Sequence, residues 1–472
     1  MKVSAVRRTA GALFALAMAW PAWAQARSLD FAQAVQLALH QNPDLRAVQA
    51  QIAQARAGVA QARGARLPRL SVSVGATRTN DALNAFGLKL AQRGATFSDF
   101  GTNDFFQASQ AGLSPAQIGA IAPTDLNHPG AVNDFSSRLE AQLPLYTGGK
   151  LEGYMRQAHA MLLAAQAGDR AARQAIVDHV LQAYDGVYTA RAYRDVAAKA
   201  LVAAQSQLKM VDNLYRQGVV LKSDVLAAQV NLENVQVQQA QAADMEAQAL
   251  DGLHVVLGLP LDEPLELGAP VSVAMPDGTP ARWTDAALQN NPQLVAMSEQ
   301  VAAAGGQVEA ARADLYPQIG AMARFETHDP NAGFAAHSYT VGAQLTWNVF
   351  DGGVARQAVD QAAAARDALQ LKLQSARAQL AMRIEDAYRR ARLADGQIKG
   401  RELAVQQAAE AERIVARRYA DGVGTLLELQ GAQAMLDKAR ADLVLARSTA
   451  TTQRAALLLA LGRLDAGAAQ PR

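Results

Sequence analysis

Hydrophobic residues recur at two different spacings along the chain, and each spacing predicts a different kind of element. Between Gly149 and Tyr215 apolar residues return every three or four positions, as at Val177, Leu181 and Tyr184, and no proline interrupts them. This spacing predicts one amphipathic helix, about 100 Å long at 1.5 Å per residue. Such a length exceeds that of ordinary globular helices, so it indicates packing like that of a coiled coil.

Four other segments alternate between apolar and polar residues, which predicts β-strands. Two of them, 135–146 and 338–350, show the alternation most clearly. Their apolar face carries Leu139, Leu143, Leu145, Leu345, Trp347 and Val349. Their polar face carries Arg138, Glu140, Gln142, Gln344, Thr346 and Asn348.

This alternation has two interpretations. An apolar-out, polar-in strand of about ten residues suits a membrane barrel with a wet lumen. The same alternation also suits an ordinary sheet packed against the chain's own helices. Four strands cannot close a barrel, and open strand edges are not tolerated in lipid, so a barrel would require several copies of the chain.

The chain contains an internal repeat. An Asn-Pro pair precedes a helical segment twice, with Pro43 and Pro292 separated by 249 residues. Later matching positions, such as Gly218 and Gly422, are separated by 204 residues. The 45-residue difference falls within 76–134, a segment rich in Gly and Pro. Helices resist insertions because each added residue rotates later side chains by about 100°, whereas loops accept them, so this segment is predicted to be a surface loop.

The repeat and the two spacings together define an expected organisation. The first repeat is 27–258, with helices about 43–66, 149–215 and 224–257, strands about 69–77 and 135–146, and a loop at 78–134. The second repeat is 281–462, with helices about 292–315, 354–419 and 428–461, and strands about 318–327 and 338–350. A linker at 259–280 joins the repeats, and 463–472 forms a C-terminal tail.

The first residues resemble a secretory signal peptide. Three basic residues, Lys2, Arg7 and Arg8, precede an apolar stretch and a small-x-small site that predicts cleavage after 24 or after 26; a retained anchor is the alternative. Without the signal the chain has 42 basic and 43 acidic residues, which argues against nucleic-acid binding. No later run of 18 apolar residues remains to form a transmembrane helix.

The residues needed for common enzyme chemistry do not occur in recognisable patterns. The chain has no cysteine, which excludes disulfides, thiolate metal sites and cysteine nucleophiles. Its seven histidines form no metal-binding spacing, and no nucleophile elbow or phosphate-binding loop is present. We therefore expect neither an enzyme nor a bound cofactor or metal.

The duplicated layout resembles the TolC-like outer membrane efflux proteins. The resemblance covers roughly 28–462 and depends on four short motifs that occur twice in order: Asn-Pro before a helix, x-Pro entering a strand, Tyr-x-x-Gly-Val turns, and a closing Leu-Gly. It implies a mainly α fold with a membrane β-barrel portion, in which four strands per chain complete a twelve-stranded barrel in a homotrimer. It also implies a long helical periplasmic tunnel, a periplasmic adaptor, and an inner-membrane pump such as a proton-driven RND transporter or an ABC exporter.

The resemblance also assigns residues to the periplasmic end of the tunnel. It implies an aperture formed by Asp224, Ser223, Tyr419 and Glu428, with Tyr419 and Asp224 at the positions of a hydrogen-bonded pair. The adaptor would contact the helix tips at Gly218, Val219, Gly422 and Val423. The chain departs from the family pattern at Gly424 and Gly431, where basic and acidic side chains are expected. Asp224 and Glu428 also fit a simpler role as acids that complement a helix dipole.

The expected function is passive conduction through the outer membrane, with small molecules the first choice of cargo and proteins or metals the others. The alternative is a periplasmic coiled-coil scaffold or adaptor without a barrel. The sequence does not identify the cargo, because a conduit selects little and the pump selects its substrate.

Overall fold

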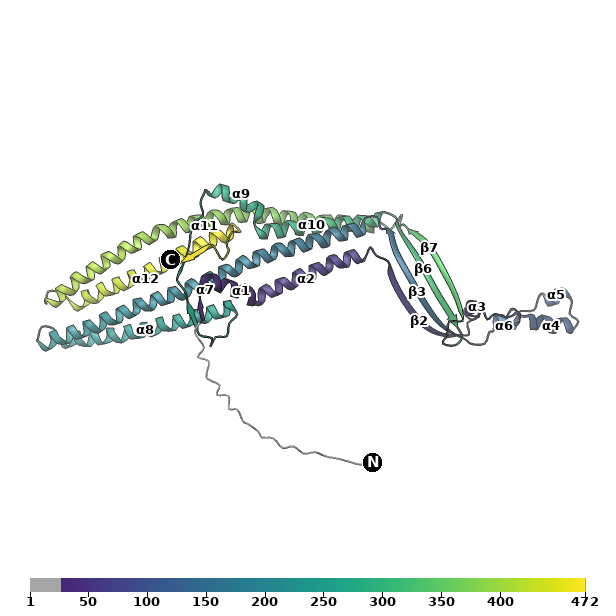
Figure 1. Cartoon of the computed structure of the whole chain (residues 1–472), viewed down its shortest axis with the longest axis horizontal. Coiled ribbons are helices and arrows are strands. Elements are labelled where there is room, and N and C mark those ends of the chain that lie inside the picture. Colours follow the sequence, from purple (N-terminus) through teal and green to yellow (C-terminus); the bar gives the residue numbers. More distant parts are fainter. Residues whose placement is uncertain (1–26, 472) are drawn as a thin grey trace, which may run out of the picture. The chain divides into compact units, whose positions relative to one another are not determined.

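The computed structural model describes residues 27–471, and the expected signal peptide lies outside them. The described chain forms two compact units. Within the described residues, unit 1 contains 27–43, 173–278 and 386–471, and unit 2 contains 44–172 and 279–385. Both units therefore draw on both sequence repeats. Two 67-residue helices, α7 (Lys150–Arg216) and α11 (Val354–Ala420), contribute to both units (Figure 1).

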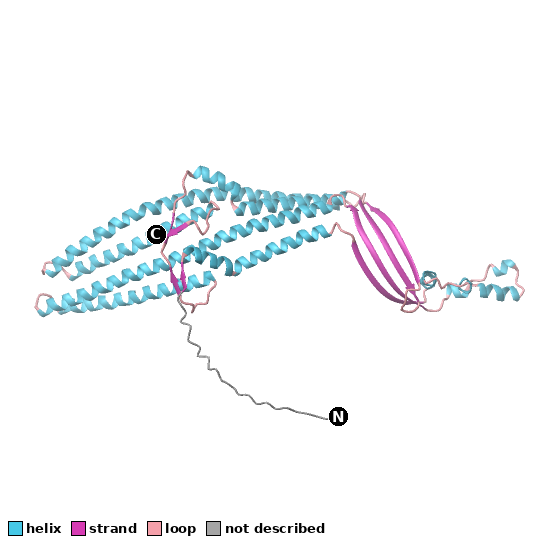
Figure 2. Ribbon diagram, in the orientation of Figure 1, coloured by secondary structure: helices cyan, strands magenta, loops and turns pink. Residues whose placement is uncertain are grey.

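Unit 2 contains a four-stranded antiparallel sheet, drawn in magenta in Figure 2. Its strands are β2 (Arg69–Thr79), β3 (Val132–Tyr146), β6 (Gln318–Asp329) and β7 (Ala336–Thr346), in the order β2-β3-β6-β7. One edge of β2 and one edge of β7 have no partner strand within the described chain. The alternation in the sequence fixes the register, because a slip of one residue would exchange the two faces.

The strand β7 is shorter than the segment expected at 338–350. It ends at Thr346, and the indole Nε1 of Trp347 donates a hydrogen bond to the carbonyl of Leu315 at 3.1 Å. Asp351 then caps the start of α11 by accepting hydrogen bonds from the backbone of Gly353 and Ala355. The expectation that Trp347, Asn348 and Val349 alternate on the sheet was therefore wrong, because these residues belong to the strand-to-helix connection.

The connection between β2 and β3 is also more structured than a loop. It contains α3 (Ala82–Ala91), a 3-10 helix at Phe97–Phe100, α4 (Thr102–Gln110), α5 (Pro115–Ile118) and α6 (Thr124–Asn127). Asp81 caps α3 by accepting a hydrogen bond from the backbone of Asn84 at 2.9 Å. The corresponding connection between β6 and β7 is a turn of a few residues.

Two helices of unit 2 approach each other unusually closely. The first turns of α7 lie against the second half of α10 (Pro292–Arg312). The helix α2 (Pro43–Gly64) is the counterpart of α10 in the first repeat and begins at the matching proline. A Cβ atom added at Gly153 would lie 2.5 Å from the backbone nitrogen of Ala310, and one added at Gly306 would lie 2.6 Å from that of Gln157. Only glycine at both positions allows this contact.

Unit 1 is built from helix pairs. The helix α8 (Lys222–Leu257) follows α7, and α12 (Leu426–Ala460) follows α11. The core contains fully buried α7 side chains, including Val180, Leu181 and Tyr184, and the ring of Tyr184 packs edge-on against Phe31 of α1 (Phe31–Gln41). Their spacing of three and four residues is the one that predicted an amphipathic helix.

Short strands complete unit 1. The strand β1 (Arg27–Leu29) pairs in parallel with β4 (Leu265–Leu267), and β5 (Val271–Val273) pairs antiparallel with β8 (Ala469–Pro471). In unit 2, the helix α9 (Pro280–Asn290) has Asn291 as its C-cap residue, just as α1 of unit 1 has Asn42. Among residues 27–471, no helix is both long enough and apolar enough to cross a bilayer.

Candidate functional site

The two helix tips in unit 1 share one turn geometry. Gly218 lies just after the end of α7 with a φ of 74°, and Gly422 lies just after the end of α11 with a φ of 72°. In both turns the next backbone N–H donates back into the preceding helix, from Val219 to the carbonyl of Leu214 and from Val423 to that of Arg418, each at 2.9 Å. Left-handed backbone at a helix C-terminus favours glycine, which explains the repeated Gly-Val pair.

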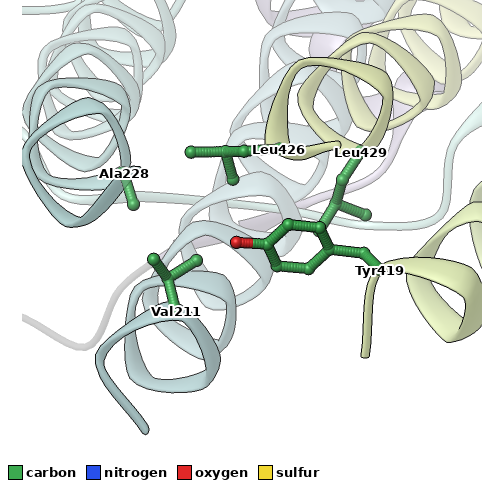
Figure 3. Close-up of a cluster of buried hydrophobic side chains, with 5 residues drawn as sticks. All are labelled: Val211, Ala228, Tyr419, Leu426 and Leu429. Atoms are coloured by element: carbon green, nitrogen blue, oxygen red, sulfur yellow. The ribbon is translucent and has the colours of Figure 1, made fainter. Parts of the chain in front are cut away.

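Tyr419 lies at the centre of the cluster that joins the two helix pairs (Figure 3). Its side chain is 2% exposed, and the other buried members of the cluster are Val211, Ala228, Leu426 and Leu429. Burial, together with the negative charge of Asp224, raises the pKa of the Tyr419 hydroxyl. Tyr419 and Asp224, which the resemblance pairs at the aperture, therefore interact electrostatically across the two helix pairs.

The hydrogen bond implied for this pair is nevertheless absent from the structure. The Tyr419 hydroxyl is buried and has no hydrogen-bond partner among the described residues. Leaving a buried hydroxyl unpaired costs about 1–3 kcal/mol, so the tip is held here by apolar packing of the ring. Gly424 packs against the same residue, because a Cβ added there would lie 3.1 Å from the Tyr419 backbone nitrogen.

Of the two acidic residues of the candidate aperture, only Glu428 caps its helix. The carboxylate of Glu428 accepts a hydrogen bond from the backbone N–H of Thr425, and the Thr425 hydroxyl accepts one from Glu428, both at 3.2 Å. This is a complete capping box, so Glu428 has the helix N-terminal role that was one of its two interpretations. Asp224 and its exposed neighbour Ser223 occupy the first turn of α8, whose N-cap is Leu221 and lacks a side-chain acceptor.

One face of the sheet carries a ladder of charges. Arg324 forms an ion pair with Glu140 at 3.0 Å, Arg138 pairs with Glu326, and Gln142 donates to Glu140. Arg324 and Glu326 were not among the expected polar-face residues. The sequence of β6 alternates weakly at its start, and the pairing of Glu140 with Arg324 in the register reveals their role.

The opposite face carries an uncovered apolar row. In the register, Val72, Leu139, Phe325 and Tyr339 lie side by side across the four strands. Val72 and Tyr339 are 72% and 81% exposed, so the sheet is not packed against helices on this face. The interpretation as an ordinary sheet covered by the chain's own helices was therefore wrong. A face of this size left exposed indicates an interaction with lipid or protein.

A sheet with one charged and one apolar face, joined by helices of 67 residues to glycine-ended tips, defines an outer-membrane channel component. The chain belongs to the outer membrane efflux protein family, whose model matches residues 34–259 and 283–463. It is an export channel protein of the outer membrane that extends into the periplasm, and the family is one of channels rather than enzymes.

Similar proteins include both secretion and efflux components. The chain is 31% identical to protein CyaE of Bordetella pertussis over 68% of this chain and 69% of that protein. It is 26% identical to the alkaline protease secretion protein AprF of Pseudomonas aeruginosa, over 71% and 70% respectively. It is 25% identical to the probable efflux pump outer membrane protein TtgC of Pseudomonas putida, over 66% of each.

Solved structures share the fold. The outer membrane protein VceC of Vibrio cholerae aligns with a TM-score of 0.74 at 20% identity, covering 92% of this chain and 96% of that one. The CmeC outer membrane channel of Campylobacter jejuni aligns with a TM-score of 0.76 at 17% identity, covering 92% and 86%.

Proposed function

We propose that three copies of this chain pool their strands into a closed twelve-stranded barrel, through which cargo passes from the periplasm to the exterior. The observation that carries this proposal is the combination of two unpaired sheet edges, on β2 and β7, with an exposed apolar face. Unpaired strand edges cannot persist in lipid, so the edges of neighbouring copies must pair. The ion-paired face of Arg138, Glu140 and Arg324 then lines a wet lumen.

The helix α11 supports association of copies independently of the sheet. Apolar side chains that are exposed in the single chain recur on it every 10 or 11 residues, which is close to three helical turns. They are Leu371, Met382, Leu393, Leu403 and Ile414. A stripe with this spacing stays on one face of the helix, and a neighbouring copy is the partner that would cover it.

The strand faces provide the test. Leu139→Arg places a charge on the apolar row, whereas Gln142→Arg adds the same side chain to the polar face. An arginine facing the bilayer midplane costs about 2–4 kcal/mol, so Leu139→Arg should sharply reduce the heat-modifiable trimer seen on semi-native gels. Gln142→Arg should leave its yield near that of the unsubstituted protein. Equal yields would contradict the assignment of faces, and a soluble monomer would contradict the whole proposal.

At the other end, the tips would form the periplasmic aperture. Three copies would place three Asp224 carboxylates around one axis, an arrangement that attracts cations. Asp224 is favoured over Glu428 for this role because the Glu428 carboxylate is already engaged by Thr425. Asp224→Ala should lower the preference of the channel for cations over anions in planar bilayers, whereas Tyr419→Phe, which keeps the packed ring, should leave it unchanged. A cation preference of Asp224→Ala equal to that of the unsubstituted channel would remove the assignment.

The same tips are the proposed contact for a periplasmic adaptor and, through it, an inner-membrane pump of the RND or ABC class. Val219 and Val423 are both well exposed at the ends of the helix pairs, beside Gly218 and Gly422. Val219→Asp with Val423→Asp should abolish copurification of the adaptor while leaving the trimer intact. Retained copurification would place the adaptor elsewhere.

Small molecules remain the first proposed cargo, as for the relative TtgC, whose name describes an efflux pump component. Protein is the second candidate, because the similar protein AprF is named for secretion of a protease. Deleting the gene separates the two: a fall in resistance to small toxic compounds supports the first, and loss of a secreted protein from the culture medium supports the second.

A further inference from the structure

The connection between β2 and β3 forms a structured element, residues 80–131, which we name the outer arm. Its base is fixed to the end of the sheet by polar contacts. The Gln92 side chain donates to the Asp134 carboxylate at 2.9 Å, and Arg93 donates to the carbonyl of His337 at 3.0 Å. Asp134 is buried and also contacts His328 Nδ1 at 3.0 Å. The base of the arm therefore contacts β3 and β7 directly.

The arm also has internal order. The rings of Phe86 and Phe100 pack edge-on with centroids 5.0 Å apart, and Lys89 forms an ion pair with Asp99. Farther along, the Asp104 carboxylate accepts a hydrogen bond from the backbone N–H of Thr124 at 2.7 Å. These contacts hold α3, α4 and α6 in a defined arrangement, which a disordered loop would not have.

The arm exposes aromatic side chains that have no partner large enough to cover them. Four of the chain's eleven phenylalanines lie within ten residues, and Phe97, Phe105 and Phe106 are 84%, 53% and 57% exposed. Burying a phenylalanine is worth about 1.5–3 kcal/mol, so three exposed rings within ten residues of sequence indicate a contact surface.

Charge and position argue against a lipid surface as the partner. Lys89 and Arg93 are the only lysine and arginine of the arm. Lys89 forms its ion pair with Asp99, and Arg93 donates to the carbonyl of His337. Four aspartates make the arm net negative, which disfavours an anionic lipid surface; they are Asp81, Asp99, Asp104 and Asp125. Within unit 2, α4, α5 and α6 also project beyond the end of the sheet (Figure 1).

Position favours the arm of a neighbouring copy. The arm begins directly after Thr79 at the end of β2, and its base contacts His337 on β7. These are the two free-edge strands that pair between copies in the proposed barrel, so each junction brings the start of one arm next to the base of another. We propose that the arms of the three copies pack on one another through Phe97, Phe105 and Phe106, forming a collar that narrows the outer exit. This inference rests on the proposed trimer.

Disulfide cross-linking tests the contact cleanly, because the chain contains no cysteine. Phe105→Cys in outer-membrane fractions should give a covalent dimer under mild oxidation, read on a denaturing non-reducing gel. The matched control is Ala116→Cys, which is also exposed on the arm but lies on α5, away from the phenylalanines. We expect at least a fivefold greater dimer fraction for Phe105→Cys. Equal or absent dimers from the two variants would overturn the collar.

A trimer measurement on the same samples separates the two proposals. If a heat-modifiable trimer is present without the Phe105→Cys cross-link, the collar fails and the proposed function stands. If no trimer forms, the proposed function itself fails.

A second variant tests the effect on conduction. Replacing Phe97, Phe105 and Phe106 together by serine removes the contact surface without touching the buried contacts of the arm. The trimer should remain, and single-channel conductance should rise at least 1.5-fold because the exit is no longer narrowed. An intact trimer with unchanged conductance would show that the arms do not narrow the exit.

Discussion

The two helix tips have the same backbone but different surroundings. Positions separated by 204 residues match one to one, so Tyr215 corresponds to Tyr419, and Leu221 to Thr425. Tyr215 is 41% exposed, whereas Tyr419 is 2% exposed at the centre of the apolar cluster. Thr425 completes a capping box, whereas Leu221 offers no side-chain acceptor to α8.

This difference teaches that duplication preserves the turn while the two copies divide the roles. The tip of α11 and α12 is fastened by an aromatic anchor and a cap. The tip of α7 and α8 contributes no buried tyrosine and no side-chain cap of its own, and it retains an acidic side chain, Asp224, that is not used for capping. The tip of α7 and α8 is therefore the one suited to move or to present its carboxylate. The tip of α11 and α12 is the one suited to hold its position.

The largest expected effect comes from removing the aromatic anchor. Tyr419→Ala leaves a cavity among Val211, Leu426 and Leu429, and loss of a buried aromatic ring costs about 3–5 kcal/mol. Hydrogen exchange of peptides from the tips should become faster, because the tips open more often once this stabilisation is lost. Tyr215→Ala is the matched control and should change exchange far less. Similar acceleration by both variants would remove the distinction between the tips.

The cap should matter next. Thr425→Ala removes the acceptor for the backbone N–H of Glu428, and losing an N-cap costs about 1 kcal/mol. Exchange in the first turn of α12 should accelerate several-fold, while the first turn of α8 should not change. An unchanged first turn of α12 would mean that the box does not stabilise the helix.

The reverse substitution should make the tips more alike. Leu221 is 72% exposed, so Leu221→Thr removes little packing and supplies the missing acceptor three residues before Asp224. We expect α8 to gain about 0.5–1 kcal/mol, visible as slower exchange in its first turn. Leu221→Val, which has the same branching without the hydroxyl, is the control. Equal slowing by valine would show that the gain is not due to capping.

The smallest effect concerns a matched pair of acids farther along the helices. Asp437 of α12 is partly buried, and this burial raises the pKa of its carboxyl, whereas the corresponding Glu233 is exposed. A raised carboxyl pKa destabilises the fold above that pKa, and the penalty disappears as the pH falls and the group is protonated. Asp437→Asn should therefore raise the melting temperature slightly at pH 7 and lose this advantage in acid. Glu233→Gln should show no such trend.

Most elements of the fold could be predicted because long helices and their glycine turns leave clear signals. The helix expected at 149–215 is observed at Lys150–Arg216, and the one expected at 354–419 at Val354–Ala420. Strand ends were less predictable: the alternation through Trp347 and Val349 continues after the ladder has ended. The helices of the outer arm were missed because its glycines and prolines dominate the pattern, although Asp81 before an apolar run is a capping signal.

The site was predictable in its location more than in its contacts. The repeated turns placed Asp224, Tyr419 and Glu428 at the tips, where the structure has them. The engagement of Glu428 was readable in the Thr-x-x-Glu pattern that begins at Thr425. The burial of Tyr419 beside an exposed Tyr215 was not, because both residues occupy the same motif and only packing between helices distinguishes them.

The glycine crossing of α7 and α10 has a mechanical consequence. Because the backbones touch at Gly153 and Gly306, neither helix can roll about its own axis there without driving a neighbouring side chain into the other's main chain. The crossing therefore fixes the rotation of both helices close to the sheet, just after β3 and just before β6. Rolling of α7 is thus blocked close to the sheet, so a twist of this helix farther along its length would not pass through the crossing to β3 or β6.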